Sequence, residues 1–163
     1  MRRMSATQLS TPKPAAAKLQ GCTNFKLRQL TRRVTQHYDA ELAQVGLRTT
    51  QYSLLSHVLK LGPIRPGALA QAMKMDASTL TRNLRPLQAA GWVEHAGGVD
   101  GRSRLISITQ SGRDKRQEAQ RHWKAAQGSL NRLFGVPRLL RLHTLIDEAL
   151  DLMTPGTTGD RDE

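Results

Sequence analysis

The fold is decided by one stretch, residues 66–91, which reads PGALAQAMKMDASTLTRNLRPLQAAG. Its first part is short and rich in alanine, and Pro66 stands where the first turn of a helix tolerates proline. After a turn at Lys74-Met75, the side chain of Asp76 can accept hydrogen bonds from the free amides of a second helix. Gly91 can end that helix in a left-handed conformation. The sequence therefore predicts two helices joined by one tight turn, which is the spacing of a helix-turn-helix.

The second helix of this pair has an apolar face and a polar face. Leu80, Leu84 and Leu87 recur at helical spacing and are expected to point inward. Short hydroxyl side chains on the other face would let the helix approach a DNA groove closely, while arginine can reach guanine or phosphate and asparagine can pair with adenine. We predict that the DNA-reading residues are Ser78, Thr79, Thr81, Arg82, Asn83 and Arg85. A solvated polar face is the alternative, and the helix alone does not decide between the two.

A hairpin is expected after the second helix. Residues 92–95 and 104–108 read as two short strands, joined by a loop that contains several glycines. Arg102 and Arg104 lie at its tip, and a cation on a projecting tip suits the narrow minor groove of DNA. We expect Asp100 to orient one of these arginines through a bidentate ion pair, because phosphate would repel its carboxylate. An ordinary charged turn is the alternative.

Two helices are expected before the helix-turn-helix. Apolar residues at three- and four-residue steps predict the first over residues 25–45, ending near Gly46. Thr49 or Thr50 can cap the second helix, which ends at Gly62. The apolar side chains of this second helix are Tyr52, Leu55, Val58, Leu59 and Leu61.

Two more helices are expected after the hairpin. The first begins at Thr109 or Ser111 and ends at Gly135. Its apolar residues form a narrow stripe that is typical of a seam between helices, namely Ala119, Trp123, Ala126, Leu130 and Leu133. The last helix carries Leu139, Leu142, Leu145, Ile146, Leu150 and Met153.

These elements predict a mainly α-helical protein with a small β-hairpin wing: a winged helix-turn-helix with N- and C-terminal dimerisation helices. The outer helices carry more apolar residues than a small winged domain can cover, so they need a partner surface. The expected segments are a disordered basic arm (1–18), an N-terminal dimerisation helix (19–48), a winged helix-turn-helix DNA-binding domain (49–109), C-terminal dimerisation helices (110–154) and a disordered tail (155–163).

The charge of the chain indicates a polyanionic partner. Lys and Arg together number 25 against 13 Asp and Glu, which gives a formal charge of +12. Nucleic acid or an anionic membrane would suit such a surface. No apolar run approaches the roughly 18 residues that a spanning helix needs, and the first residues lack the apolar segment of a signal peptide. We therefore expect double-stranded DNA as the partner, no membrane, and a cytoplasmic location.

Catalysis finds little support in the sequence. The five histidines do not stand at metal-ligand spacing with one another, and no glycine-rich phosphate loop is visible. A single cysteine, Cys22, cannot form an internal disulfide or a zinc site by itself. We expect no enzyme, no cofactor and no metal.

Four stretches together resemble the MarR family, the multiple-antibiotic-resistance regulators, over roughly residues 22–153. They are LAQAM (69–73), MDASTLTR (75–82), LQAAGWV (87–93) and DGRSRLISIT (100–109). The last is the specific one, since it looks like the wing signature of the family. The resemblance implies a homodimer held by the first and the last two helices, two winged domains that read a pseudo-palindrome, and repression relieved by a small ligand or an oxidant. Two-fold symmetry would then place the recognition helices about one DNA turn, roughly 34 Å, apart.

Two features of the sequence could receive the signal that such a regulator would sense. Cys22 resembles in position the reactive cysteine of the organic-hydroperoxide sensors in the family, and a thiol near a helix N-terminus can be activated. The surrounding residues 23–26 depart from those sensors, and no second cysteine can resolve an oxidised one, so a passive small residue is the alternative. A pocket between the first, second and fifth helices could instead hold a small aromatic acid near Arg28, unless that arginine is merely solvated.

The sequence therefore predicts a sequence-specific, DNA-binding transcriptional regulator that acts as a homodimeric repressor. The main alternative is a basic nucleic-acid-binding protein without sequence preference, for which charge alone would suffice. A homologue that has lost DNA affinity is disfavoured, because Arg82, Arg85 and Arg102 are present.

Overall fold

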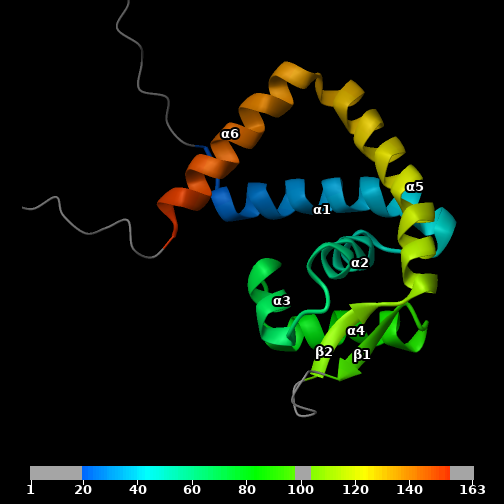
Figure 1. Ribbon diagram of the computed structural model, residues 1–163. Coiled ribbons are helices and arrows are strands. Elements are labelled where there is room, and N and C mark those ends of the chain that lie inside the picture. The colour runs from blue at the N-terminus through cyan, green and yellow to red at the C-terminus, as the bar shows by residue number, and fades with distance from the viewer. Residues whose placement is uncertain (1–19, 98–103, 155–163) are drawn as a thin grey trace, which may run out of the picture.

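The computed structural model describes residues 20–97 and 104–154. Its elements are α1 (Thr23–Leu42), the short 3-10 helix η1 (Ala43–Val45), α2 (Thr49–Leu61), α3 (Pro66–Ala72), α4 (Ala77–Ala89), β1 (Val93–Gly97), β2 (Arg104–Ile108), α5 (Gln110–Phe134) and α6 (Val136–Leu152). Figure 1 shows two parts. We call the unit from α2 to β2 the head, and α1, α5 and α6, which form an open triangle above it, the frame. The predicted winged helix-turn-helix with additional helices on both sides is confirmed.

The head has a hydrophobic core centred on α2, which contacts α4, β2 and α5. Leu54 and Leu55 on α2 are both fully buried. The sequence pattern singled out Leu55 but missed Leu54, because a helix covered on more than one side buries more than one stripe. Leu61, expected with the apolar set, lies instead at the end of the helix and is 39% exposed. The head therefore packs as a unit within one chain.

The start of α2 differs from the prediction. We expected Thr49 or Thr50 to cap this helix, but the N-cap residue is Arg48, and its side chain makes no capping hydrogen bond to a free amide. The carboxylate of Asp39, on α1, accepts from the Thr49 backbone N–H at 2.7 Å and from the Thr49 hydroxyl at 2.6 Å. The threonine cap was wrong because an acceptor from a neighbouring helix satisfies the free amide, and local spacing cannot reveal such a residue.

Aromatic rings also join the frame to the head. The ring of Trp123 on α5 lies between Tyr38 of α1 and Tyr52 of α2, with centroid distances of 6.3 and 6.1 Å. Such separations allow favourable ring contacts beyond simple burial. The contact explains why α2 holds a fixed place beneath α1 and α5.

The wing is a two-stranded antiparallel sheet in which Val93 pairs with Ile108 and Gly97 with Arg104. Strand β2 has the predicted bounds. Strand β1 begins one residue later than expected, because the Trp92 N–H donates to the carbonyl of Leu87 and so closes the end of α4. Ile64, between α2 and α3, adds a single antiparallel bridge to Ile106. The base of the wing is therefore tied to the helices.

The frame contains both buried and exposed apolar residues. Thr109 caps α5 as predicted, by accepting from the Gly112 N–H. Within the predicted stripe of α5, Ala119, Ala126 and Leu130 are buried, whereas Leu133 is 72% exposed. A residue with φ of 77°, Gly135, separates α5 from α6. Among the helices of residues 20–97 and 104–154, none is both long and apolar enough to cross a membrane.

Candidate DNA interface

The helix-turn-helix consists of α3, a tight turn and α4. The Met75 N–H donates to the Ala70 carbonyl at 3.0 Å, and the Lys74 N–H donates to the Gln71 carbonyl at 3.1 Å. Lys74 has a φ of 52°, a left-handed conformation that is uncommon for a residue with a side chain. The turn predicted at Lys74-Met75 is confirmed, and it fixes the angle between the two helices.

Asp76 caps α4, as predicted. Its carboxylate accepts from the Thr79 backbone N–H and the Thr79 hydroxyl, both at 2.7 Å, and from the Ser78 hydroxyl at 2.5 Å. These bonds, that from Ser78 first, hold the pKa of Asp76 well below its ordinary value, so the side chain is an anion at neutral pH. An anion of the chain itself therefore occupies the N-terminus of α4, where a phosphate could otherwise bind.

The exposed face of α4 carries Ser78, Arg82 and Arg85, spaced by four and three residues. This spacing puts the three side chains on one side of the helix, opposite the buried leucines Leu80 and Leu84. The two guanidinium groups therefore share an outward face that no other part of the described chain covers. They are the predicted residues that this geometry makes most accessible to a groove.

The other predicted residues of α4 are less free. Thr81 is exposed, but its hydroxyl donates to the Ala77 carbonyl at 2.8 Å. Thr79 is half-buried, and its hydroxyl serves Asp76 and accepts from Arg82 at 3.2 Å. Asn83 is also half-buried, since it lies about 60° around the helix from the row of leucines, at 100° per residue. Arg82 and Arg85 are therefore more exposed to a DNA groove than Asn83 is.

The described part of the wing carries one of its predicted residues. Arg104 is exposed at the start of β2, opposite Gly97. Asp100 and Arg102 lie outside the described residues. His95 on β1 lies 2.8 Å from the amide nitrogen of Gln88 on α4, measured to the imidazole Nε2. Sequence reasoning missed this link between the recognition helix and the wing, because no spacing rule relates the two positions.

Cys22 precedes α1, and Arg28 lies in its second turn. Cys22 is the N-cap residue of α1, and its thiol is exposed. Arg28 lines a shallow groove of about 320 Å³ together with Leu27, Thr31 and Arg32. All four lining residues come from α1, so the groove is not the predicted pocket between the first, second and fifth helices.

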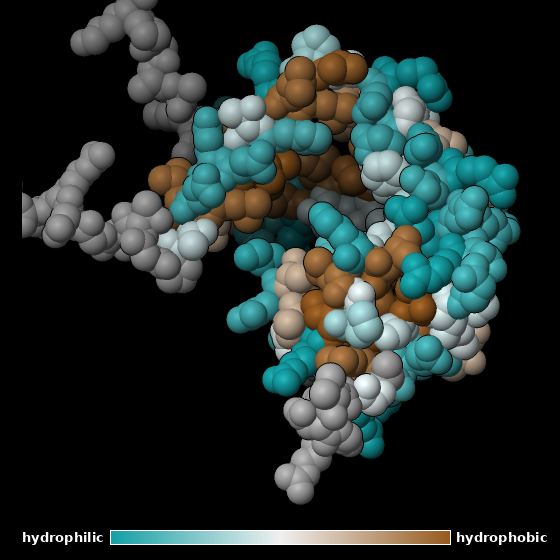
Figure 2. Space-filling model, in the orientation of Figure 1, coloured by the Kyte–Doolittle hydropathy of each residue, from teal (hydrophilic) through white to brown (hydrophobic). Residues whose placement is uncertain are grey.

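An apolar hollow lies between α1, α5 and α6. Its volume is about 300 Å³, and Leu30, Val34, Leu130, Phe134 and Ile146 are among its lining residues. Figure 2 shows hydrophobic side chains gathered along this hollow, beneath α6. No lysine or arginine lines it. It therefore offers a mainly apolar surface, with His143 rather than a lysine or an arginine as its basic side chain.

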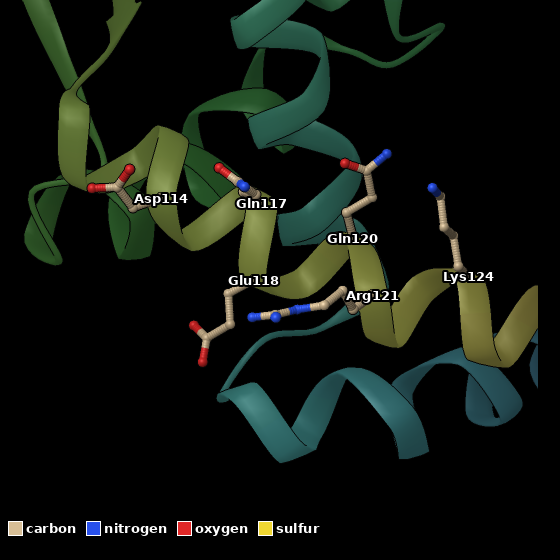
Figure 3. A pocket seen from close by; sticks show the side chains of 6 residues that line it. All are labelled: Asp114, Gln117, Glu118, Gln120, Arg121 and Lys124. Atoms are coloured by element: carbon tan, nitrogen blue, oxygen red, sulfur yellow. The ribbon is translucent and has the colours of Figure 1, made fainter.

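A second hollow, of about 350 Å³, lies along the outer side of α5 and is lined by charged and amide side chains. In Figure 3 the side chain of Arg121 extends toward Glu118. Lys115 donates to the Glu118 carboxylate at 2.9 Å and thereby lowers the pKa of that group. This hollow has no apolar wall to hold a ring.

Across residues 20–97 and 104–154, no three His, Cys, Asp or Glu side chains are grouped so that they could hold a metal ion.

Comparison with known proteins agrees with this architecture. Residues 45–103 match the sequence model of the MarR family. The chain is 27% identical to YwoH, an HTH-type transcriptional regulator of Bacillus subtilis, over 93 residues that make up 57% of this chain and 68% of YwoH. It is 31% identical to a second B. subtilis regulator of this type, YxaD, over 55% of this chain and 63% of YxaD.

Solved structures extend the similarity to about four fifths of the chain. The transcriptional regulator MosR of M. tuberculosis, solved in complex with DNA, is 30% identical, with a TM-score of 0.68 over 81% of this chain and 98% of MosR. A mutant form of E. coli MarR, complexed with operator DNA, shares the fold with a TM-score of 0.71 at 18% identity, over 78% of this chain and 92% of that one. The chain belongs to the MarR family and is a DNA-binding transcriptional regulator with a winged helix-turn-helix.

Proposed function

We propose that this protein is a cytoplasmic, homodimeric repressor that recognises a pseudo-palindromic operator, with one α4 in the major groove of each half-site. The observation that carries this proposal is the exposed face of α4, where Arg82 and Arg85 stand opposite a row of buried leucines. Arginine paired with guanine in the major groove is the commonest specific contact between a protein and a base. Phosphate contacts by the other cations of this basic chain add affinity without sequence choice.

The apolar surface of the frame supports the homodimer. Leu145, Ile146 and Leu150, which share one side of α6, are 63, 40 and 61% exposed, and Phe25 and Leu27 on α1 are also exposed. So much exposed apolar surface on α6 and α1 is typical of a surface that another protein covers. We assign a second copy of this chain as the partner, because α6 of one copy presents leucines of the kind that line the hollow of the other. The contact would then be two-fold symmetric.

The wing contributes in this proposal from the flanks of each half-site. Arg102 and Arg104 would enter the minor groove, and Asp100 would orient them. Arg104 is exposed at the base of the loop, which is compatible with this role. Replacing Arg102 with alanine is expected to weaken binding most where the flanking DNA is rich in A·T pairs, since its narrow minor groove attracts arginine most strongly.

We further propose that a signal received on α1 releases the DNA. Arg28 and Arg32, one helical turn apart, line a groove with Leu27, and this arrangement suits a small aromatic acid. Cys22 is the second candidate receiver, because its thiol is exposed just before the first turn of α1. A peroxide would transfer one oxygen atom to the sulfur, giving a sulfenic acid and the corresponding alcohol. Titrating the DNA complex with salicylate and with cumene hydroperoxide, for wild type, Arg28→Ala and Cys22→Ser, tells these receivers apart.

The experiment that tests the function measures binding of purified protein to the intergenic DNA beside its own gene and to a scrambled duplex. At about 0.15 M salt, purely electrostatic binding is suppressed. We expect one dimer per site and a preference of at least about 10³-fold for the intergenic DNA. If that duplex and random-sequence DNA selections both show no preferred sequence, the protein is instead a non-specific basic nucleic-acid-binding protein.

A further inference from the structure

Four segments meet at one point of the molecule: the end of α4, the start of β1, the end of β2 and the start of α5. The hydroxyl of Thr109 donates to the Gly91 carbonyl at 2.7 Å, and its backbone N–H donates to the Trp92 carbonyl at 3.1 Å. The same hydroxyl accepts from the Gly112 N–H at 3.1 Å, in the first turn of α5. We call Gly91, Trp92, Thr109 and Gly112 the joint. One threonine there ties the recognition helix and both wing strands to α5.

Gly112 lets α5 approach the wing more closely than a residue with a side chain could. A Cβ atom on Gly112 would lie 2.0 Å from the Trp92 carbonyl oxygen and 2.9 Å from Cγ1 of Ile108. The carbonyl belongs to the backbone, so it cannot swing aside like the end of a flexible side chain. In the next turn of α5, the Lys115 ammonium lies 5.6 Å from the centroid of the Trp92 ring. The contact between α5 and Trp92 is therefore held on two sides.

We propose that Thr109 and Gly112 are positioning residues for DNA binding, which fix the direction in which α4 and the wing leave α5 and thereby set the operator spacing. The inference rests on the proposed homodimer on paired half-sites. In that dimer, α5 connects the head to the frame, and the frame holds the two copies together. The angle at the joint then determines the separation of the two recognition helices.

The size of the effect follows from the length of α4. This helix has 13 residues, so its N-terminal end lies about 20 Å from the joint at 1.5 Å per residue. A rotation of about 10° at the joint would move that end by roughly 3.4 Å, which is the rise of one base pair. A small change in the joint is therefore sufficient to shift the preferred spacing by one base pair.

The test uses duplexes whose two half-sites are moved closer together or further apart by one or two base pairs, and a duplex with a single half-site. Fluorescence anisotropy gives the affinity of wild type, Gly112→Ala, Thr109→Val and Thr109→Ser for each duplex. Gly128→Ala is the matched control on the same helix, because a Cβ there would meet only a flexible Arg132 side-chain atom at 3.6 Å. Circular dichroism and sedimentation check the fold and the dimer of each variant.

We expect Gly112→Ala and Thr109→Val to reduce the preference for the native half-site spacing over the neighbouring spacings by at least about tenfold. A change of that size lies in the lower range of the cost of overpacking a tight contact. Binding to the single half-site should stay unchanged, and Thr109→Ser and Gly128→Ala should match wild type. An equal loss on every duplex, or unchanged spacing preference in both variants, overturns the positioning role. If Gly112→Ala does not fold, Thr109→Val decides. If the wild type shows no spacing preference, the proposed function on paired half-sites is overturned. This result differs from variants that keep the spacing preference of wild type, which overturn only the positioning role.

Discussion

The head and the frame both carry leucine at helical spacing, but the frame leaves much more of it exposed. In the head, Leu54, Leu55 and Leu80 are almost completely buried within one chain. In the frame, Leu145 and Leu150 remain more than half exposed. The helices of the head fold back on one another, whereas α6 and α1 enclose a hollow of about 300 Å³. The comparison indicates that the head is complete in one chain, whereas the frame leaves an apolar surface exposed that the proposed second copy would cover.

The largest expected effect concerns the core of the head. Leu54→Ala should lower the free energy of unfolding by about 2–5 kcal/mol, because it leaves a cavity at a fully buried position. Leu61→Ala, on the same helix but exposed, is the matched control and should cost far less. Chemical denaturation followed by circular dichroism measures both. Equal costs for the two variants would contradict the view that α2 is the centre of the head.

In the frame, a charge placed on the exposed apolar surface should weaken the proposed dimer. Leu150→Asp places a carboxylate on the face of α6 that also carries Ile146, and should weaken the dimer by at least about 2 kcal/mol, the size of an interface hot spot. Thr144→Asp, on the opposite face of the same helix, is the control and should leave the dimer intact. Sedimentation equilibrium gives the dissociation constants. A monomeric wild type, or an unaffected Leu150→Asp variant, would refute the second copy as the partner.

The exposed face of α4 predicts a difference among its own residues. Arg82→Ala and Arg85→Ala should each reduce discrimination between the operator and mutated operators by about 1–3 kcal/mol. Asn83→Ala should do less, because Asn83 is half-buried. Lys124→Ala, on the outer side of α5, is the control for the loss of one positive charge. Competition binding with single-base operator variants measures the effect, and a uniform loss across all sequences would assign these arginines to phosphate instead.

The sequence was informative where the determining contacts are local. The turn at Lys74-Met75, the cap at Asp76, the left-handed Gly91 and the bounds of β2 all follow from residues close together in the chain, and all were predicted. Spacing also gave the inward face of α4. These features need only backbone geometry and one helical turn of neighbours.

Contacts between distant segments were not predictable in the same way. Asp39 caps α2 from another helix, and Gly112 meets a carbonyl twenty residues earlier in the chain, so no periodic pattern marks either residue. The expected effector pocket between the first, second and fifth helices stays a prediction, because which helices enclose a hollow depends on packing angles that no periodic pattern fixes. The roles of individual DNA-contacting residues remain predictions, since polar surface residues carry no pattern that fixes their partners.

The hydrogen bonds from Thr49 to Asp39, which link the head to the frame, should contribute less to the free energy of unfolding than the core does. Asp39→Ala removes the acceptor for both the Thr49 N–H and its hydroxyl, and should lower the free energy of unfolding by about 1 kcal/mol, as for other lost caps. Asp39→Asn keeps one oxygen acceptor and should cost less. Thermal unfolding of the three proteins measures the order. If Asp39→Asn and Asp39→Ala lower the free energy of unfolding equally, α2 requires the charge of Asp39 rather than its oxygen acceptor.

The smallest expected effect is the contribution of Asp76 to acid stability. Its pKa is lowered in the folded protein, so the folded state binds fewer protons than the unfolded state and the stabilisation is complete above the ordinary pKa of about 3.9. It should be lost as the pH falls below that value toward the lowered pKa of the folded state. Asp76→Asn keeps an acceptor for the Thr79 N–H but does not titrate, so its unfolding free energy should fall less steeply with acid than that of wild type. Denaturation midpoints between pH 5 and pH 3 compare the two, and parallel curves would mean that the hydrogen bonds from Ser78 and Thr79 favour the anion no more than water does.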